Sequence, residues 1–173
     1  MDNANRGSTR LGRLVDADFS NARRSAFLRG LLALLLNRPI HLLSFHEVHD
    51  NLEEEAYVGI RTVDVARIVG SVNRYQDFDR SFFPIRTSGA ERWKRVDRAH
   101  YESIELPPPI LLKAGDVYFV YDGHNRVSVA RLHEMECIQA EVVEYHRQAT
   151  VVAPAQTIQP VPSRELGAEL DTA

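Results

Sequence analysis

The sequence predicts an α+β domain with a helical arm in front of it, and three observations carry this prediction. Short segments rich in β-branched residues recur between residues 60 and 146, bounded by turn-forming residues, as expected for the strands of a small mixed sheet. A strand, a glycine turn and a helix follow one another at 117–133. A leucine-rich stretch at 27–36 has the broad apolar face of a helix and precedes every predicted strand.

The amino-acid composition excludes several classes of protein. The 173 residues fit one domain, and 44% apolar with 26% charged residues are ordinary values for a globular chain. With 21 basic and 24 acidic residues the net charge is −3, which excludes a generally polycationic nucleic-acid binder. The single cysteine, Cys137, excludes a disulfide framework and is typical of a reducing compartment, so a cytoplasmic location is expected.

The chain divides into four predicted segments. Residues 1–18 are rich in Asn, Ser, Thr and Gly and predict a disordered start. Residues 19–59 form the helical arm, and residues 60–146 form the α+β domain. Residues 147–173, where prolines are scattered among Ala, Thr and Gln, predict a disordered tail.

The first helix of the arm carries the leucines of 27–36 and ends at Asn37 and Pro39. Its apolar run of about eleven residues is too short to cross a bilayer, which needs roughly 20 residues, so no membrane partner is expected. The leucine face is wider than a surface helix on a small domain needs. We therefore expect it to be buried against the domain or against a second copy of the chain, in a homodimer.

A second helix is predicted to open at Ser44 and to run to Gly59. Ser44 and Glu47 have the spacing of a capping box, in which each side chain bonds the backbone of the other residue. His46 and His49 lie beside this glutamate, but their spacing is not that of an HExxH motif and the capping role explains Glu47. The sequence predicts no metal site.

Residues 60–146 supply the sheet and its helices. Alternating β-branched residues predict strands, apolar residues at helical spacing predict helices, and Gly, Pro and Asp mark the turns. The expected strands are 60–65, 110–112, 117–121 and 138–142, and the expected helices are 90–103 and 125–133.

The run Asp122-Gly123-His124-Asn125-Arg126, between a strand and a helix, carries the clearest chemistry. A glycine at this position lets the backbone present unpaired N–H groups at a helix N-terminus, where the helix dipole favours an anion. Arg126 can grip phosphate oxygens, His124 and Asn125 add donors, and Asp122 can orient His124 or hold a metal ion. The alternative is a tight turn in which Arg126 pairs with a surface acid, and spacing alone does not separate the two.

The segment 108–131 resembles the ParB/sulfiredoxin-like fold, whose signature is a strand hairpin followed by Gly-x-x-Arg and an alanine-bearing helix. Here the signature is Gly123-His124-Asn125-Arg126, with Ala130 in the helix. The first strand and its loop at 63–79, and the last strand at 138–143, have counterparts in that fold. The resemblance thus covers roughly 60–146 with a gap in the middle. As a whole, the chain is similar to uncharacterised bacterial ParB-like proteins with an added helical arm.

Some residues differ from the family pattern, and these differences limit which of the family's activities the resemblance implies. His124 stands where sulfiredoxins have their nucleophilic cysteine, and no helix-turn-helix of the chromosome-partitioning ParB proteins fits into the polar residues after the last strand. The form Asp-Gly-His-x-Arg is closer to the free-serine kinases of this fold. Those enzymes pair the phosphate-binding turn with an acid on the first loop, where this chain has Asp77 and Asp79.

The resemblance therefore implies a nucleotide-phosphate-binding domain whose reaction is phosphotransfer or nucleotide hydrolysis. Under this hypothesis ATP or CTP is the ligand, Mg²⁺ accompanies it, and His124, Asp77 and Asp79 are catalytic. The expected phosphate-binding residues are Arg74, Asp122, Gly123, His124, Asn125 and Arg126.

Two other classes of function stay open. Arginines interleaved with aromatic residues between 74 and 93 suggest a nucleic-acid-binding or nuclease module, although Phe78, Phe82 and Phe83 are also typical of a core, and we do not favour this alternative. The leucine face of the arm suggests a regulatory or interaction protein without catalysis.

Overall fold

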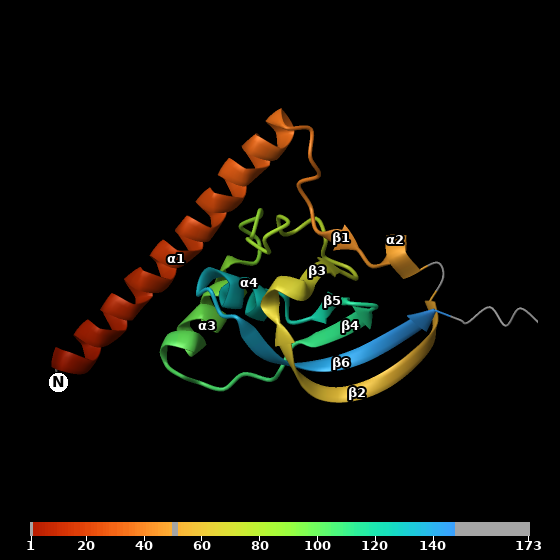
Figure 1. Cartoon of the computed structure of the whole chain (residues 1–173). Helices are drawn as coiled ribbons and strands as arrows, with labels where there is room; N and C mark the ends of the chain where they lie inside the picture. Colours follow the sequence, from red (N-terminus) through yellow and green to blue (C-terminus); the bar gives the residue numbers. More distant parts are fainter. Residues whose placement is uncertain (1, 50–51, 148–173) are drawn as a thin grey trace, which may run out of the picture.

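The chain has a mixed α+β architecture with a long N-terminal helix and a six-stranded mixed sheet, in a computed structural model that describes residues 2–49 and 52–147 (Figure 1). Its helices are α1 (Asp2–Leu35), α2 (His46–His49), α3 (Ala90–Tyr101) and α4 (His124–Leu132), with a 3-10 turn at Val65–Arg67. Its strands are β1 (Leu43–Ser44), β2 (Leu52–Asp64), β3 (Ile68–Ser71), β4 (Ile110–Ala114), β5 (Val117–Asp122) and β6 (Cys137–Arg147).

The strands lie in the order β1-β3-β5-β4-β6-β2. β4 and β5 form an antiparallel hairpin, β6 runs parallel to β4, and β2 pairs with β6 in antiparallel fashion. β3 runs parallel to β5. The loop after Ser71 and the turn after Asp122 therefore leave the sheet at the same edge, which brings residues about fifty positions apart in the sequence next to each other.

The sheet is buried on both faces in its centre. Leu111 of β4 packs in the cluster that includes Val127 of α4, whereas its neighbour Leu112 packs with Phe45 in a separate cluster. In the helical layer, the indole N–H of Trp93 in α3 donates a 2.8 Å hydrogen bond to the hydroxyl of Ser128 in α4. This bond between two buried side chains fixes α3 against α4, and so positions the N-terminus of α4.

α1 is longer than predicted and is attached through a different face. It begins at Asp2, so the prediction of a disordered start at 1–18 is wrong for the residues described there. The buried apolar side chains of α1 are Val15, Phe19, Ala22 and Ala26. They recur at helical spacing, and Phe19 packs on Trp93 with ring centroids 5.4 Å apart. This stripe contains two alanines within a polar stretch, which is why the composition concealed the helix.

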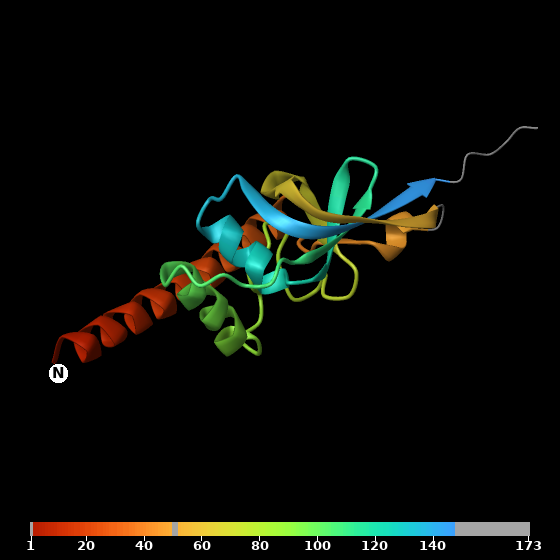
Figure 2. The same ribbon diagram turned by 90° about the horizontal axis from the view of Figure 1, so that it is seen from below.

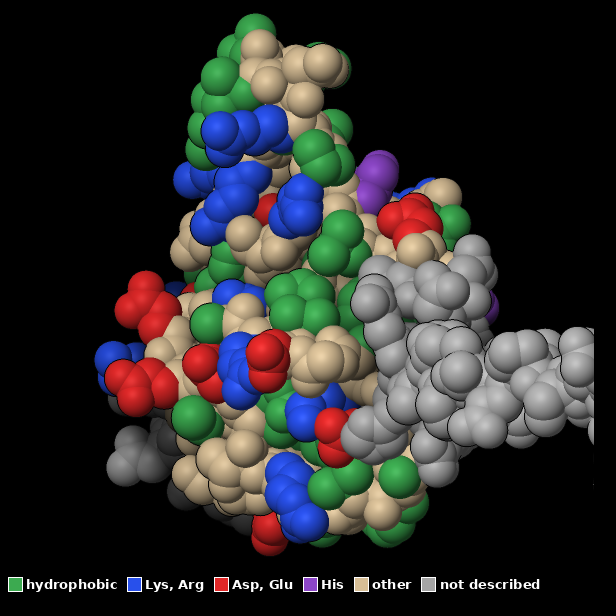
Figure 3. Space-filling view, turned by 45° about the vertical axis from the view of Figure 1, so that its right-hand side comes forward, with side chains coloured by type: hydrophobic (Ala, Val, Ile, Leu, Met, Phe, Trp, Pro, Cys, Tyr) green, Lys and Arg blue, Asp and Glu red, His purple; other side chains and the backbone are tan. Residues whose placement is uncertain are grey.

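The leucine-rich end of α1 is exposed in the single chain. α1 crosses α3, and apolar side chains gather at its projecting C-terminal end, at the top of the space-filling view (Figures 1, 2 and 3). The large apolar side chains between 27 and 36 are 49–75% exposed. The expectation that they pack on the domain is therefore wrong, whereas their burial against a second copy stays a prediction.

The second predicted helix of the arm is mostly a strand. Only His46–His49 is helical, and β2 then pairs with β6 along its length, ending with Asp64 opposite Cys137. Strand pairing with a distant segment outweighs the local helix preference of the glutamate-rich run, as tertiary context commonly does. The helix predicted from Ser44 to Gly59 is thus corrected to a single turn followed by β2.

The other predicted elements are confirmed. α3, β4, β5 and α4 match the expected ranges within a few residues, while β2 and β6 extend further than predicted. The predicted tail lies outside the described residues beyond Arg147. None of the helices in the described part of the chain combines the length and the apolarity that a bilayer span requires.

Candidate functional site

The turn between β5 and α4 presents free backbone donors. Gly123 is the N-cap of α4 and has a φ of +93°, in the left-handed region that favours glycine. A Cβ at this position would lie 2.6 Å from the Cβ of Pro109 and 2.8 Å from Nε of Arg126. The N–H groups of His124 and Asn125 have no acceptor inside α4, and they make no hydrogen bond with any other described residue.

A cavity of about 370 Å³ lies at this turn. Arg74 reaches it from the loop after β3, Arg92 from the first turn of α3, and Arg126 from α4. The cavity is also lined by Asn73, Val96, Leu106, Pro107, Tyr121, Asp122, Gly123, His124 and Asn125. Three arginines and one aspartate line the cavity, so its lining carries a net positive charge.

Arg126 is already engaged with the protein. Its Nη2 donates to the Asp122 carboxylate at 2.7 Å, and its Nη1 donates to the carbonyls of Pro107 and Pro108, the latter at 3.1 Å. The alternative foreseen for Arg126, pairing with an acid, is therefore part of the structure. These bonds tie the 107–108 segment to the turn, so Arg126 stabilises one wall of the cavity. Because Nη1 and Nη2 already donate to the protein, fewer of its N–H groups are left for a ligand.

His124 is buried, with 3% of its surface exposed. Its Nε2 lies 2.7 Å from the hydroxyl of Ser71, and its ring stacks on Phe78. Burial, assisted by the nearby Arg74, lowers the pKa of His124 to about 4, so the imidazole is neutral at pH 7.

The contact between His124 and Ser71 also orients Arg74. The Ser71 hydroxyl accepts a 2.9 Å hydrogen bond from the backbone N–H of Arg74 and shares a second hydrogen bond with Nε2 of His124. A neutral histidine satisfies this chain of hydrogen bonds in either tautomer, because the hydroxyl can donate to Nε2 or accept from it. His124 therefore connects the N-terminus of α4 to the loop that carries Arg74, and it helps to hold that loop in position.

Asp77 lies beside the cavity without lining it. Its carboxylate accepts from Nε of Arg74 at 2.8 Å and lies 3.7 Å from Nη1 of Arg86. It lines a small neighbouring cavity together with Arg74 and Asn125. Asp77 thus holds Arg74 in position, close to the turn at Gly123.

Asp79 is not brought to the turn. Its Oδ1 accepts hydrogen bonds from the N–H groups of Ser81 and Phe83, at 2.9 and 2.8 Å, and its Oδ2 lies 3.7 Å from Nη1 of Arg29 in α1. Burial is the main cause that raises the pKa of this carboxyl. Asp79 closes a loop and ties α1 to it, so its position does not support the catalytic role predicted for it.

Four of the five aromatic residues between 74 and 93 are part of the core. Phe78, Phe82, Phe83 and Trp93 are all at most 8% exposed, so they are not available to stack on bases. The nearby Arg74 and Arg86 pair with Asp77 of the same loop. These four aromatic side chains thus give no support to base stacking, while Tyr75 is half-buried and the nucleic-acid-binding module stays a prediction.

Two features of the site were not predicted from the sequence. Arg92 lines the cavity, and its guanidinium makes no ion pair or hydrogen bond with the residues that the structure describes. A second, mainly apolar cavity of about 560 Å³ adjoins the first, because Val96, Leu106, Pro107 and Arg126 line both. The only sequence feature that could have indicated Arg92 is its position in the first turn of a predicted helix. Many exposed arginines occupy such positions.

Comparisons of the chain with protein-family models, with curated proteins and with solved structures find no match.

Proposed function

We propose that this chain binds the phosphates of a nucleoside di- or triphosphate at the N-terminus of α4, in a ParB/sulfiredoxin-like domain. The observation that carries the proposal is the cavity at Gly123, which is lined by three arginines and by His124 and Asn125, whose backbone N–H groups have no partner among the described residues. A helix N-terminus and arginine side chains are the groups that proteins use to hold phosphate. ATP and CTP are the first ligands to test, as the resemblance implies.

Each cation has its own part in this proposal. Arg92, whose guanidinium has no partner in the described part of the chain, supplies the direct grip on phosphate oxygens. Arg74 keeps donors beyond the one that it gives to Asp77, and it adds a second grip. Arg126 holds the wall of the cavity through Asp122, Pro107 and Pro108. The adjoining apolar cavity gives the base and sugar a place next to the phosphates.

Phosphotransfer or nucleotide hydrolysis remains the reaction that we propose on the resemblance. Asp122 is the carboxylate that lines the cavity, which makes it the candidate ligand for a Mg²⁺ ion that arrives with the nucleotide. Asp77 is the next carboxylate, held behind Arg74. His124 is buried and neutral at pH 7, and it is proposed here to position the turn and Arg74, with no proton transfer to substrate assigned to it.

A thermal-shift panel of ATP, ADP, CTP and GTP with Mg²⁺ tests this function. A bound ligand at one hundred times its dissociation constant stabilises the folded state by about 2.7 kcal/mol, which raises the unfolding temperature of a chain of this size by about 5–10 °C. We expect such a rise with at least one nucleotide and none with the free nucleoside. If none of the four nucleotides raises the unfolding temperature above that of the ligand-free chain, the element at Gly123 is only a turn.

The exposed end of α1 favours a second candidate function, interaction through the arm. Isolated apolar side chains on a surface need no partner, but this end of the helix exposes a contiguous group of them. We expect the chain to form a homodimer through this face in sedimentation experiments at micromolar concentration. The double substitution Leu28→Glu and Leu35→Glu should give a monomer, whereas the matched pair Arg23→Glu and Arg24→Glu, on exposed polar positions of the same helix, should remain dimeric. A parent chain that stays monomeric across this concentration range would rule out the homodimer.

A further inference from the structure

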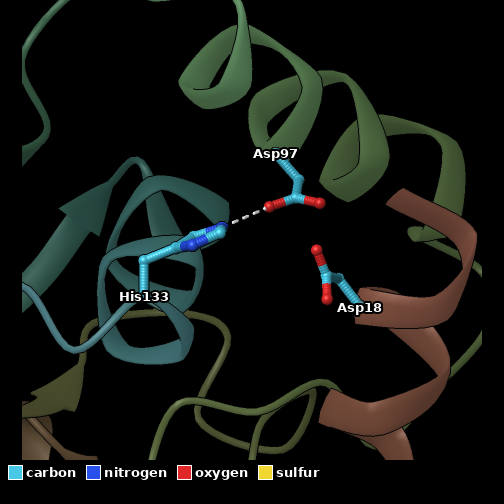
Figure 4. Close-up of side chains that lie close together, drawn as sticks. All are labelled: Asp18, Asp97 and His133. Carbon is cyan, nitrogen blue, oxygen red and sulfur yellow. Dashed lines mark hydrogen bonds and ion pairs between the residues drawn. The ribbon is translucent and has the colours of Figure 1, made fainter. Parts of the chain in front are cut away.

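Three side chains from three helical elements meet on the face where α1 crosses α3 and α4 (Figure 4). Asp18 comes from α1, Asp97 from α3, and His133 follows the last residue of α4. One ligand atom from each of these side chains lies within 4.8 Å of the others. None of the three belongs to the cavity at Gly123.

The charges of this group are not balanced by the side chains that the structure describes. Asp97 is fully buried, and only one of its carboxylate oxygens, Oδ1, has a partner there, which is Nε2 of His133 at 2.7 Å. The other oxygen, Oδ2, is buried and makes no hydrogen bond with any described residue. In Figure 4 this second oxygen lies on the side of Asp97 nearer to Asp18, one of whose carboxylate oxygens points towards it. Among the described residues, no lysine or arginine pairs with either carboxylate.

The surroundings hold these side chains in place. Tyr101 donates a 2.6 Å hydrogen bond to Oδ2 of Asp18, and its pKa is raised to about 12, mainly by this bond. The ring of His133 stacks on His100, with ring centroids 4.1 Å apart. A buried carboxylate with an unpartnered oxygen is costly unless a cation or a proton neutralises it. Here a second carboxylate faces it, which increases that cost.

We propose that Asp18, Asp97 and His133 form a binding site for a divalent transition-metal ion of the Zn²⁺ class. Carboxylate oxygens and an imidazole nitrogen are ligands that Zn²⁺ accepts, at bond lengths of about 2.0–2.2 Å, so its ligand atoms stand about 3–3.5 Å apart. The ligand atoms lie within 4.8 Å of one another, so small rotations of these side chains bring them into this range. On metal binding, Nε2 of His133 exchanges its hydrogen bond to Asp97 for a bond to the metal, and the unpartnered Oδ2 of Asp97 supplies the carboxylate ligand.

A metal at this position connects the arm to the domain. α1 is otherwise attached through its short apolar stripe and through polar contacts such as the 2.7 Å ion pair between Asp16 and Lys94. Ligands from three helical elements around one ion cross-link α1, α3 and α4. Binding therefore stabilises the docked position of α1 as well as the chain as a whole. This inference does not rest on the nucleotide proposal.

Calorimetric titration of the tag-free, chelator-treated full chain with ZnCl₂, in the absence of nucleotide, tests the site. We expect one equivalent to bind, the unfolding temperature to rise by about 5–10 °C at a hundredfold excess over the dissociation constant, and amide exchange in α1 to slow. Asp97→Asn and His133→Gln should each weaken binding at least tenfold. Asp18→Asn, at a partly exposed position, provides the same test if the buried variants fold poorly.

Asp16→Asn is the matched control, because Asp16 lies on the same helix and also contacts α3, but outside the group of three. It should bind Zn²⁺ within twofold of the parent. Failure of the parent to bind one equivalent overturns the proposal and leaves the two carboxylates sharing a proton. Unchanged affinity in the Asp18, Asp97 and His133 variants places the metal elsewhere and overturns it equally. A site of this kind should also bind MgCl₂ much more weakly than ZnCl₂, since imidazole is a poor ligand for Mg²⁺.

Discussion

Gly123→Ala is expected to lower the free energy of unfolding by about 3 kcal/mol and to remove nucleotide binding at the same time. A non-glycine residue in the left-handed region costs about 1–2 kcal/mol, and forcing a side chain into occupied space costs about 1–3 kcal/mol more. Both costs apply, because φ at this position is +93° and the added Cβ would lie 2.6 Å from Pro109 and 2.8 Å from Arg126. Urea denaturation followed by the fluorescence of the single tryptophan, Trp93, measures the loss.

Gly59→Ala separates the two costs. Gly59 also has a positive φ, +84°, but no atom lies within 4 Å of the Cβ that alanine would add. This control should lose about 1–2 kcal/mol, from backbone strain alone. If Gly123→Ala costs no more than Gly59→Ala, the close packing of the turn against Pro109 and Arg126 is not a constraint on the site.

The stability of the chain is expected to fall by about 3 kcal/mol between pH 6.5 and pH 4 through His124 alone. Burial lowers the pKa of His124 to about 4, against 6.5 for an exposed imidazole, and each tenfold change in proton affinity corresponds to about 1.4 kcal/mol. A lowered histidine pKa means that the unfolded chain binds the proton more tightly than the folded chain. The contribution is thus complete above pH 6.5 and is lost as the pH falls towards 4.

The measurement is the difference between parent and His124→Gln in urea denaturation at several pH values. Glutamine keeps a polar group within reach of Ser71 but does not titrate. The difference is needed because burial raises the pKa of Asp79 and Asp97, and their protonation favours the folded state over part of the same range. The two curves should converge as the pH falls. Parallel curves would mean that the folded protein protonates His124 as easily as the unfolded chain does.

Local patterns could predict the turn at Gly123 but not the cavity around it. A strand, a glycine and a helix follow one another within about fifteen residues, and local periodicity detects such a run. Arg92 lies thirty residues away and joins the cavity only because Trp93, its neighbour, fixes α3 on Ser128 of α4. The placement of Arg74 likewise depends on the parallel pairing of β3 with β5, which a single sequence does not reveal.

The two clearest errors of sequence reasoning have one physical cause. The leucines of 27–36 and the capping pattern at Ser44 are strong local signals for a buried helix face and for a helix start. In both segments, however, packing or pairing with distant parts of the chain determines the structure. α1 packs through Ala22 and Ala26 instead of its leucines, and the segment after His49 pairs with β6. The group formed by Asp18, Asp97 and His133 was missed for the same reason, because its members are scattered over more than a hundred residues.

Calorimetric titration of the parent and of Arg92→Gln with Mg-ATP and Mg-CTP tests the central claim, that the cavity at Gly123 binds nucleotide phosphates. A hydrogen bond to a charged group contributes about 1.5–3 kcal/mol, so Arg92→Gln should weaken the parent's binding by about ten- to a hundredfold. Arg95→Gln, one turn further along the exposed side of α3 and outside the cavity, should bind as the parent does. A parent that binds neither nucleotide, or an Arg92→Gln variant that binds as well as Arg95→Gln, would contradict the account.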